Sequence, residues 1–294
     1  MHTPANNAKD FPLIKEVHAY RILQALILFK QNPLDRDAQR DGILKLYNEK
    51  EKKEKEEKSV FRGMIIPSFR KLGFLQGWED MISLSANGLI IAEAGELSIE
   101  YGMRALRALV LEKDREYLSI VETGIMNDIT MPALYERLRM QIPAPSDAQR
   151  HERLKRWITL LCNAKLIEKT DMEHLSVVQT HLKIACSDLD SPPKAKGFPD
   201  ILFHIYGELV RTQHGIDVVD IADLRYYVSK KYFETRKAIL TEHQFDRLLR
   251  ELPITTPNYL ISFGKPMGPE EKLFELNGQY YRTLSVRTLT RRNQ

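Results

Sequence analysis

Acidic residues and lysines, the side chains of metal-dependent nucleases, are plentiful in the 294-residue sequence but are not spaced for that chemistry. A nuclease of the restriction type needs clustered carboxylates, with an acid-x-lysine pair on a neighbouring strand. Pro199-Asp200 is the only Pro-Asp pair, and it lies at an expected helix start, while Glu234-Thr235-Arg236-Lys237 has the wrong spacing. We therefore expect no nuclease site and no catalytic residues.

Patterns that bind nucleotides or metals are also missing from the sequence. It contains neither GxxxxGK[ST] nor GxGxxG, so it offers no phosphate-binding loop. Cys162 and Cys186 have no CxxC spacing, and no HExxH or Cys/His cluster occurs. We expect no cofactor, no metal and no disulfide, and any ATP hydrolysis would belong to a partner protein.

Basic side chains remain as the groups best suited to bind a ligand, because lysine and arginine contact phosphates. The densest group is opposed only by Glu152. The candidate DNA-binding residues are Arg150, His151, Arg153, Lys155 and Arg156, then Arg62, Arg70 and Lys71, then Arg247 and Arg250, and finally Arg287, Arg291 and Arg292.

The distribution of charge leaves a second interpretation open. The net charge is +4, and the last thirteen residues supply four arginines without an acid, so residues 1–281 are formally neutral. The run Glu49–Lys58 contains five lysines and five glutamates and also cancels. The basic residues could therefore meet protein carboxylates instead of phosphates, or form ordinary solvated helix faces.

The elements that would position these residues begin with helices. An apolar pattern predicts a buried helix over Ile14–Lys30. Asp35 or Asp37 is placed to cap the next helix and Ser59 a third, which Pro67 should kink or split.

A second stretch repeats this plan. A helix is predicted over Met103–Leu111 and Glu116–Glu122, and a later one is capped by Ser146 or Asp147. In a third stretch Asp217 or Asp220 is placed to cap a helix. Downstream, Asn277-Gly278 predicts a tight hairpin.

The ends of the first two stretches align at an offset of about ninety residues, which indicates a repeated unit. Leu72-Gly73-Phe74-Leu75 matches Ala164-Lys165-Leu166-Ile167, and Leu84-Ser85 matches Leu175-Ser176. Each match falls where a strand should follow a helix. We predict two-stranded wings over 73–85, 165–178 and 259–286.

Three helices followed by a β-hairpin resemble a winged helix, and the whole chain resembles tandem winged-helix proteins. The step Leu72-Gly73-Phe74 is similar to segments in the DNA-recognition portion of type IIS restriction endonucleases. The kite subunits of SMC complexes are also tandem winged helices. The first resemblance implies duplex DNA binding, with the third helix of a unit entering the major groove. The second implies contacts with protein partners.

The predicted class is α+β, mainly α with small β-hairpins, in three winged-helix units. The boundaries are 11–98, 99–187, a linker 188–197, 198–288 and a basic tail 289–294. We expect a cytoplasmic, non-enzymatic subunit of a prokaryotic DNA-targeting, defence-type assembly that binds double-stranded DNA and a partner carrying ATPase or nuclease activity. The alternative is a kite-like adaptor for an SMC-type ATPase or a nuclease. No signal peptide or membrane span is expected.

Overall fold

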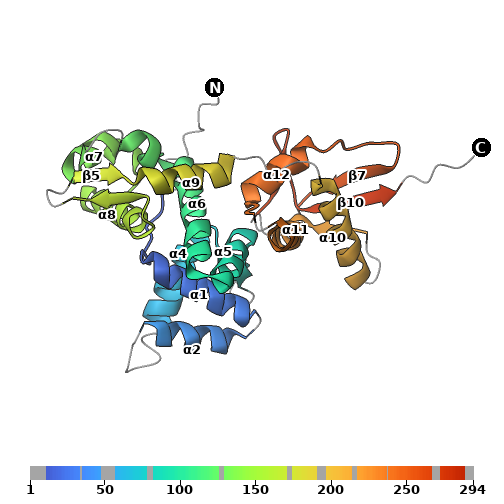
Figure 1. Ribbon diagram of the computed structural model, residues 1–294, viewed down its shortest axis with the longest axis horizontal. Coiled ribbons are helices and arrows are strands. Elements are labelled where there is room, and N and C mark those ends of the chain that lie inside the picture. Colours follow the sequence, from blue (N-terminus) through green and yellow to red (C-terminus); the bar gives the residue numbers. More distant parts are fainter. Residues whose placement is uncertain are drawn as a thin grey trace, which may run out of the picture. The chain divides into compact units, whose positions relative to one another are not determined.

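The computed structural model divides into two compact units, which are described separately (Figure 1). Unit 1 holds Met1–Leu84 and Ile91–Ser191, and unit 2 holds Ser85–Ile90 and Pro192–Gln294. The described part of the whole chain is mostly helical with small antiparallel sheets, which confirms the predicted α+β class. The structure describes residues 11–33, 35–47, 57–77, 82–125, 129–170, 174–190, 197–213, 217–236, 238–266 and 272–288.

The first part of the chain supplies helices and a two-stranded sheet. Its elements are α1 (Ala19–Gln31), α2 (Arg36–Leu46), the π-helix η2 (Glu57–Ile65), α4 (Ile66–Lys71), β1 (Leu75–Gln76), β2 (Ser83–Leu84) and α5 (Ala86–Leu97). Asp35 caps α2 by accepting a hydrogen bond from the backbone N–H of Ala38 at 2.9 Å, as predicted. Pro67 stands in the first turn of α4, so the third helix is split there as expected.

Two expectations for this part were wrong. The first helix begins at Ala19, not at Ile14, because Phe11 and Ile14 are buried on an extended segment instead. Ser59 lies inside η2 and therefore does not begin a helix. The charged run from residue 49 lies outside the described residues except at its last two positions.

The second part of the chain builds a three-stranded sheet between helices. Its elements are α6 (Ile99–Tyr117), the π-helix η4 (Ile120–Gly124), β3 (Ile129–Thr130), α7 (Met131–Leu138), the 3₁₀-helix η5 (Arg139–Gln141), α8 (Asp147–Asn163), β4 (Ile167–Lys169), β5 (His174–Val177) and α9 (Gln179–Asp190). Ser146 caps α8 through the N–H of Gln149, as predicted. The sheet has the order β3-β5-β4, and β3 was not predicted.

Two further predictions need correction here. The helix predicted over Met103–Leu111 and Glu116–Glu122 is α6, but it begins earlier, at Ile99, and ends at Tyr117, before η4. The predicted linker 188–197 begins too early, because α9 extends to Asp190. Arg115 holds this end of α9 by donating to Asp190 at 2.8 Å.

The two copies of the repeat share one turn geometry after their third helix. Gly73 and Lys165 both take the left-handed conformation, with φ of 76° and 59°. In each copy the next N–H, of Phe74 or Leu166, donates to the carbonyl five residues earlier, at 2.8 and 3.0 Å. This is the Schellman arrangement that ends a helix and redirects the chain into a strand.

Strand register corrects the alignment of the repeat by two residues. Leu75 pairs with Leu84, and Ile167, the match of Leu75, pairs with Val177. Leu84 therefore corresponds to Val177 and not to Leu175. The pairings confirm strands in the first two predicted wings, although the first wing's turn, residues 78–81, lies outside the described residues.

A buried polar contact holds the centre of unit 1. The ring of Trp157, from α8, packs edge-on against Phe11 and Tyr117 at centroid distances of 5.8 and 5.4 Å. Its Nε1–H donates to the carboxyl of Asp114 at 2.8 Å, and the N–H of Val121 donates to the other oxygen at 2.8 Å. Asp114 thus joins α6, η4 and α8, and burial raises the pKa of its carboxyl to about 6.

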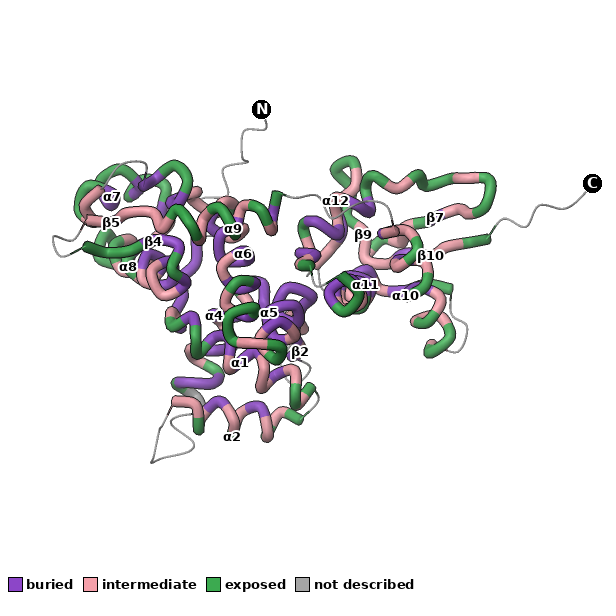
Figure 2. The backbone as a smooth tube through the Cα atoms, in the orientation of Figure 1, coloured by how far each residue is buried: buried purple, intermediate pink, exposed green. Residues whose placement is uncertain are grey.

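Two glycines allow α1, α5 and α6 to approach closely. A Cβ added at Gly102 would lie 2.7 Å from the Cα of Gly95 and 2.7 Å from Leu23, shorter than real Cβ contacts. Figure 2 shows buried positions along α5 and along one side of α1. The absence of side chains at these two positions therefore permits the packing of this helical layer.

The elements of unit 2 follow the main order of the second part of unit 1, but without η4, η5 and α9 and with two additional strands. They are α10 (Phe198–Thr212), β6 (Val219–Asp220), α11 (Ile221–Arg236), α12 (Glu242–Glu251), β7 (Tyr259–Gly264), β8 (Phe274–Leu276), β9 (Gln279–Tyr281) and β10 (Thr283–Thr288). The sheet order β6-β10-β7 repeats β3-β5-β4, and β6 was likewise not predicted. Asp220 caps α11 through the N–H of Ala222 at 2.8 Å, as predicted.

The segment predicted as the third wing, residues 259–286, contains four strands instead of the predicted two. β7 pairs with β10, while β8 and β9 form an additional hairpin between them. Asn277 and Gly278 make its turn with φ of 53° and 77°, which confirms the predicted hairpin signal. Beneath it, Arg225 is 3% exposed and binds Asp246 at 2.7 and 2.9 Å, so α11 and α12 are joined by a buried ion pair.

Candidate functional site

Two arginines predicted to contact DNA hold the N-terminal segment on α8. One terminal nitrogen of Arg153 donates to the carbonyls of Phe11 and Pro143, at 2.9 and 2.7 Å. Arg156 donates to the carbonyl of Lys15 at 3.2 Å. These bonds fix both guanidinium groups. The bonds of Arg153 leave its charge unmatched because carbonyl oxygens carry no net charge, whereas Arg156 is also paired with the carboxylate of Glu152.

The other basic residues of α8 differ in exposure. Arg150 is half-buried and donates to the carbonyl of Ile142 at 3.2 Å. His151 is exposed, and its ring stands edge-on to Tyr135 at 5.1 Å. Lys155 is exposed. These side chains do not form one continuous free row on the helix.

Basic residues from the first two predicted winged-helix units, 11–98 and 99–187, lie near one another in unit 1. Burial, and then the like charges of Arg153 and Lys15, lower the pKa of the Lys71 ammonium at the end of α4. Lys15 is exposed, and its ammonium donates to the carbonyl of Gly63 at 2.9 Å. We call Lys15, Lys71, Arg153 and Arg156 the α4–α8 basic cluster. Its one ion pair with a described carboxylate joins Arg156 to Glu152, at 2.5 Å.

The remaining predicted residues are spread over both units. Arg62 is exposed on η2, whereas Arg70 donates to the carbonyl of Gly77. In unit 2, Arg250 donates to the carbonyl of Glu275 at 2.8 Å and stacks on Phe274.

Two more of the predicted DNA-binding residues, Arg247 and Arg287, lie in unit 2. Arg247 is half-buried on α12, and Arg287 is exposed near the end of β10. Arg291 and Arg292 lie outside the described residues. Arg247, Arg250 and Arg287 belong to unit 2, whereas the α4–α8 basic cluster belongs to unit 1.

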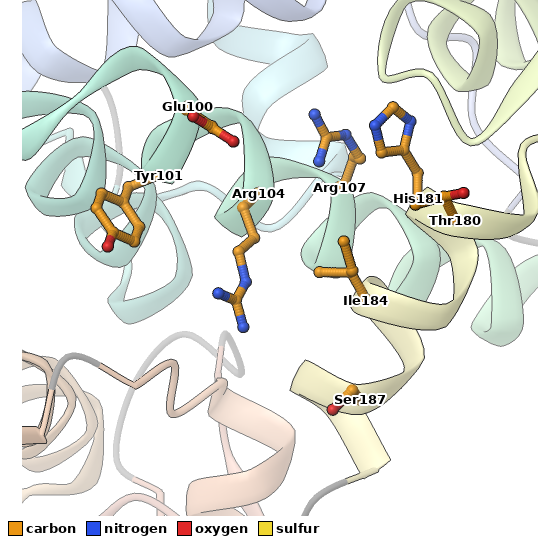
Figure 3. A pocket seen from close by; sticks show the side chains of 8 residues that line it. All are labelled: Glu100, Tyr101, Arg104, Arg107, Thr180, His181, Ile184 and Ser187. Carbon is orange, nitrogen blue, oxygen red and sulfur yellow. The ribbon is translucent and has the colours of Figure 1, made fainter.

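A groove between α6 and α9 was not predicted. It has a volume of about 490 Å³, and α9 lies across α6 at this point (Figures 1 and 3). Both helices contribute residues at the same spacing of i, i+1, i+4 and i+7. The lining residues are Glu100, Tyr101, Arg104 and Arg107 from α6 and Thr180, His181, Ile184 and Ser187 from α9.

Consecutive backbone carbonyls at the end of α8, those of Ala164 and Lys165, orient the side chains of Arg107 and His181 in this groove. Nε of Arg107 donates to the carbonyl of Ala164 at 3.0 Å. Nδ1 of His181 lies 2.9 Å from the carbonyl of Lys165, and since a carbonyl only accepts, Nδ1 is the protonated nitrogen. Figure 3 shows the two side chains next to each other.

Large apolar side chains are exposed in the groove and at the neighbouring start of α6. Tyr101 is 54% and Ile184 37% exposed. Leu97 and Ile99, at the end of α5 and the start of α6, are 55% and 56% exposed. Large apolar side chains grouped on a surface are typical of binding sites. The sequence did not lead us to predict this groove. Its signal was three large apolar residues, Leu97, Ile99 and Tyr101, just before the helix predicted from Met103.

Comparison with protein families, curated proteins and solved structures finds no match to this chain. Among the described residues, no group of three His, Cys, Asp or Glu side chains is arranged to hold a metal ion. In the same part of the chain, no helix combines the length and the apolar character needed to cross a membrane.

Proposed function

We propose that this protein is a non-enzymatic, cytoplasmic DNA-binding subunit of a prokaryotic DNA-targeting assembly, built from winged-helix units. The order helix, strand, helix, helix, strand, strand supports this reading, because α6–β5 and α10–β10 both follow it once the short helices η4 and η5 and the inserted hairpin β8–β9 are set aside. The shared strand order β3-β5-β4 and β6-β10-β7 gives it further support. The first unit, around α1–β2, lacks the first strand of this pattern among the described residues.

The α4–α8 basic cluster is the observation that carries the proposal. In winged helices the third helix and its surroundings contact DNA, and here α4 and α8 are the third helices of two successive units. Lys71 comes from the first and Arg153 from the second, and their like charges act on each other. Such a surface attracts phosphates and gains from the release of counterions.

Duplex binding should therefore depend steeply on salt and on the exposed lysines of the cluster. We would measure the binding of a fluorescent duplex oligonucleotide by anisotropy at several salt concentrations. Removing two phosphate contacts with Lys15→Gln and Lys71→Gln should weaken binding and reduce the salt slope by roughly two. These lysines are preferred to Arg153 and Arg156, whose replacement would also release the N-terminal segment.

The matched control is Lys45→Gln, an exposed lysine of α2 outside the cluster, which should leave the slope unchanged. Deleting residues 289–294 tests the separate contribution of Arg291 and Arg292. If the double lysine variant binds duplex DNA as the wild type does, with the same slope, the cluster is not the DNA contact and the proposal fails.

The second candidate function is a kite-like adaptor that contacts an SMC-type ATPase or a nuclease. The exposed apolar side chains Leu97, Ile99, Tyr101 and Ile184 favour it, because they are uncommon on a surface that binds only phosphates. The two functions are compatible in one subunit, since the groove and the α4–α8 basic cluster share no residue.

A further inference from the structure

The α6–α9 groove presents two side chains, Arg107 and His181, whose orientations are fixed by backbone carbonyls, and the charge of Glu100 acts on Arg107. Nε of Arg107 donates to the carbonyl of Ala164, and Nδ1 of His181 donates to the carbonyl of Lys165. Both side chains are therefore held in fixed orientations. The terminal nitrogens of Arg107 have no hydrogen-bond partner among the described residues, and burial lowers the pKa of this guanidinium. These nitrogens and Nε2 of His181 remain available to donate to an anion when the imidazole is protonated.

The neighbouring charges limit how much negative charge the site can accept. Arg104 already makes two hydrogen bonds with Asp188, at 2.8 and 2.5 Å, so its charge is largely matched. Glu100 stands at the same groove and adds a negative charge. One carboxylate on Arg107 and His181 therefore fits the balance better than a row of phosphates.

The apolar side chains indicate what else the ligand must carry. Tyr101 and Ile184 come from facing helices and leave about half and a third of their surface exposed. A groove of about 490 Å³ accommodates more than one side chain of a peptide. Burying an apolar side chain there would remove Tyr101 and Ile184 from water and strengthen the nearby charge-assisted hydrogen bonds.

We propose that the groove docks a segment of a partner protein in which a carboxylate stands next to a large apolar residue. The carboxylate binds Arg107 and His181, and the apolar side chain lies between Tyr101 and Ile184. This goes beyond the proposed DNA contact, because no groove residue belongs to the α4–α8 basic cluster. It specifies the docking site and the partner chemistry of the adaptor function.

The test uses the full chain and peptides selected from a random twelve-residue display library. Selected peptides would be synthesised with a fluorophore, and their affinities measured by fluorescence polarisation. We expect an Asp or Glu within four residues of a Leu, Ile, Phe or Trp. Replacing the acid of the peptide by its amide should weaken binding at least tenfold.

Variants on the protein side locate the site. Arg107→Gln removes the charge, and Ile184→Glu places a carboxylate on an exposed apolar position, where we expect only a small cost to folding that circular dichroism would check. Each should weaken peptide binding at least tenfold. Lys183→Gln is the matched control, because this exposed lysine lies on α9 outside the groove lining and should leave binding unchanged.

Three results would overturn the proposal. They are selection of peptides without an acid, unchanged affinity in both Arg107→Gln and Ile184→Glu, and displacement of the peptide by inorganic phosphate or duplex DNA alone. Lys15→Gln with Lys71→Gln should lower DNA affinity and leave peptide affinity unchanged. The failure of one proposal can therefore be told from the failure of the other.

Discussion

Replacing Asp114 by asparagine should remove a pH dependence that this buried carboxyl imposes on the stability of unit 1. The carboxyl has an ordinary pKa of 3.8, and burial raises it to about 6 in the folded protein. Between these values the folded state binds more protons than the unfolded state, so the free energy of unfolding falls as pH rises. The contribution is complete below the unfolded pKa and is lost once pH exceeds the folded value.

The size of the effect follows from the two pKa values. Each unit of difference corresponds to about 1.4 kcal/mol, so the full effect of Asp114 is roughly 3 kcal/mol, of which about 2.4 kcal/mol is lost between pH 4 and pH 7. Asparagine does not titrate. It keeps one acceptor, but its amide N–H₂ faces the N–H of Val121 or Trp157, which costs about 1–3 kcal/mol at any pH.

The stability gap between wild type and Asp114→Asn is therefore larger near pH 4 than near pH 7, by about 2.4 kcal/mol. Urea unfolding followed by circular dichroism at both pH values measures it, and other titrating groups cancel in the difference. Because Nε1 of Trp157 donates to this carboxyl, Trp157 emission in a Trp78→Phe background should titrate with the same midpoint. A gap that does not change with pH would refute the reasoning.

Two further predictions concern packing and charge. Gly102→Ala should destabilise the protein by about 1–3 kcal/mol through overpacking, whereas Gly207→Ala, where an added Cβ meets nothing within 4 Å, should be neutral or stabilising; equal melting temperatures for the two variants would contradict this. Arg225→Ala should cost unit 2 about 3–5 kcal/mol by leaving the carboxylate of Asp246 without its partner. The double variant Arg225→Met with Asp246→Leu should recover most of this loss in chemical denaturation, and a single variant as stable as the wild type would exclude a structural role for the pair.

Local signals in the sequence were enough to predict several elements. Asp35, Ser146 and Asp220 cap helices, and Asn277-Gly278 forms a tight turn, because each effect depends on backbone groups a few residues away. The strands β3 and β6 were missed because two residues are too few to show an alternating pattern. The register error at Leu175 arose because the repeat was aligned on its two Leu-Ser pairs, Leu84-Ser85 and Leu175-Ser176. The strand pairing instead makes Val177 the counterpart of Leu84.

Contacts between distant segments could not be predicted in the same way. Arg153 sits on a helix face with ordinary spacing, and only the folded chain brings the carbonyl of Phe11 to it. The α6–α9 groove likewise combines Arg107 and His181, whose anchoring carbonyls belong to a third helix end. The type of each side chain was visible, but whether its polar atoms were engaged depended on tertiary packing.

The attachment of the N-terminal segment to α8 has a consequence for synthesis. Phe11 is bonded to Arg153, which lies 142 residues later in the chain. A ribosome adds about 5–20 residues per second, so roughly 7–30 s pass between the two residues. During this time Phe11, which is buried in the finished protein, is without its partners Arg153 and Trp157 on α8. We expect the nascent chain to hold this apolar segment exposed to chaperones until α8 leaves the exit tunnel, and unit 1 to close only then.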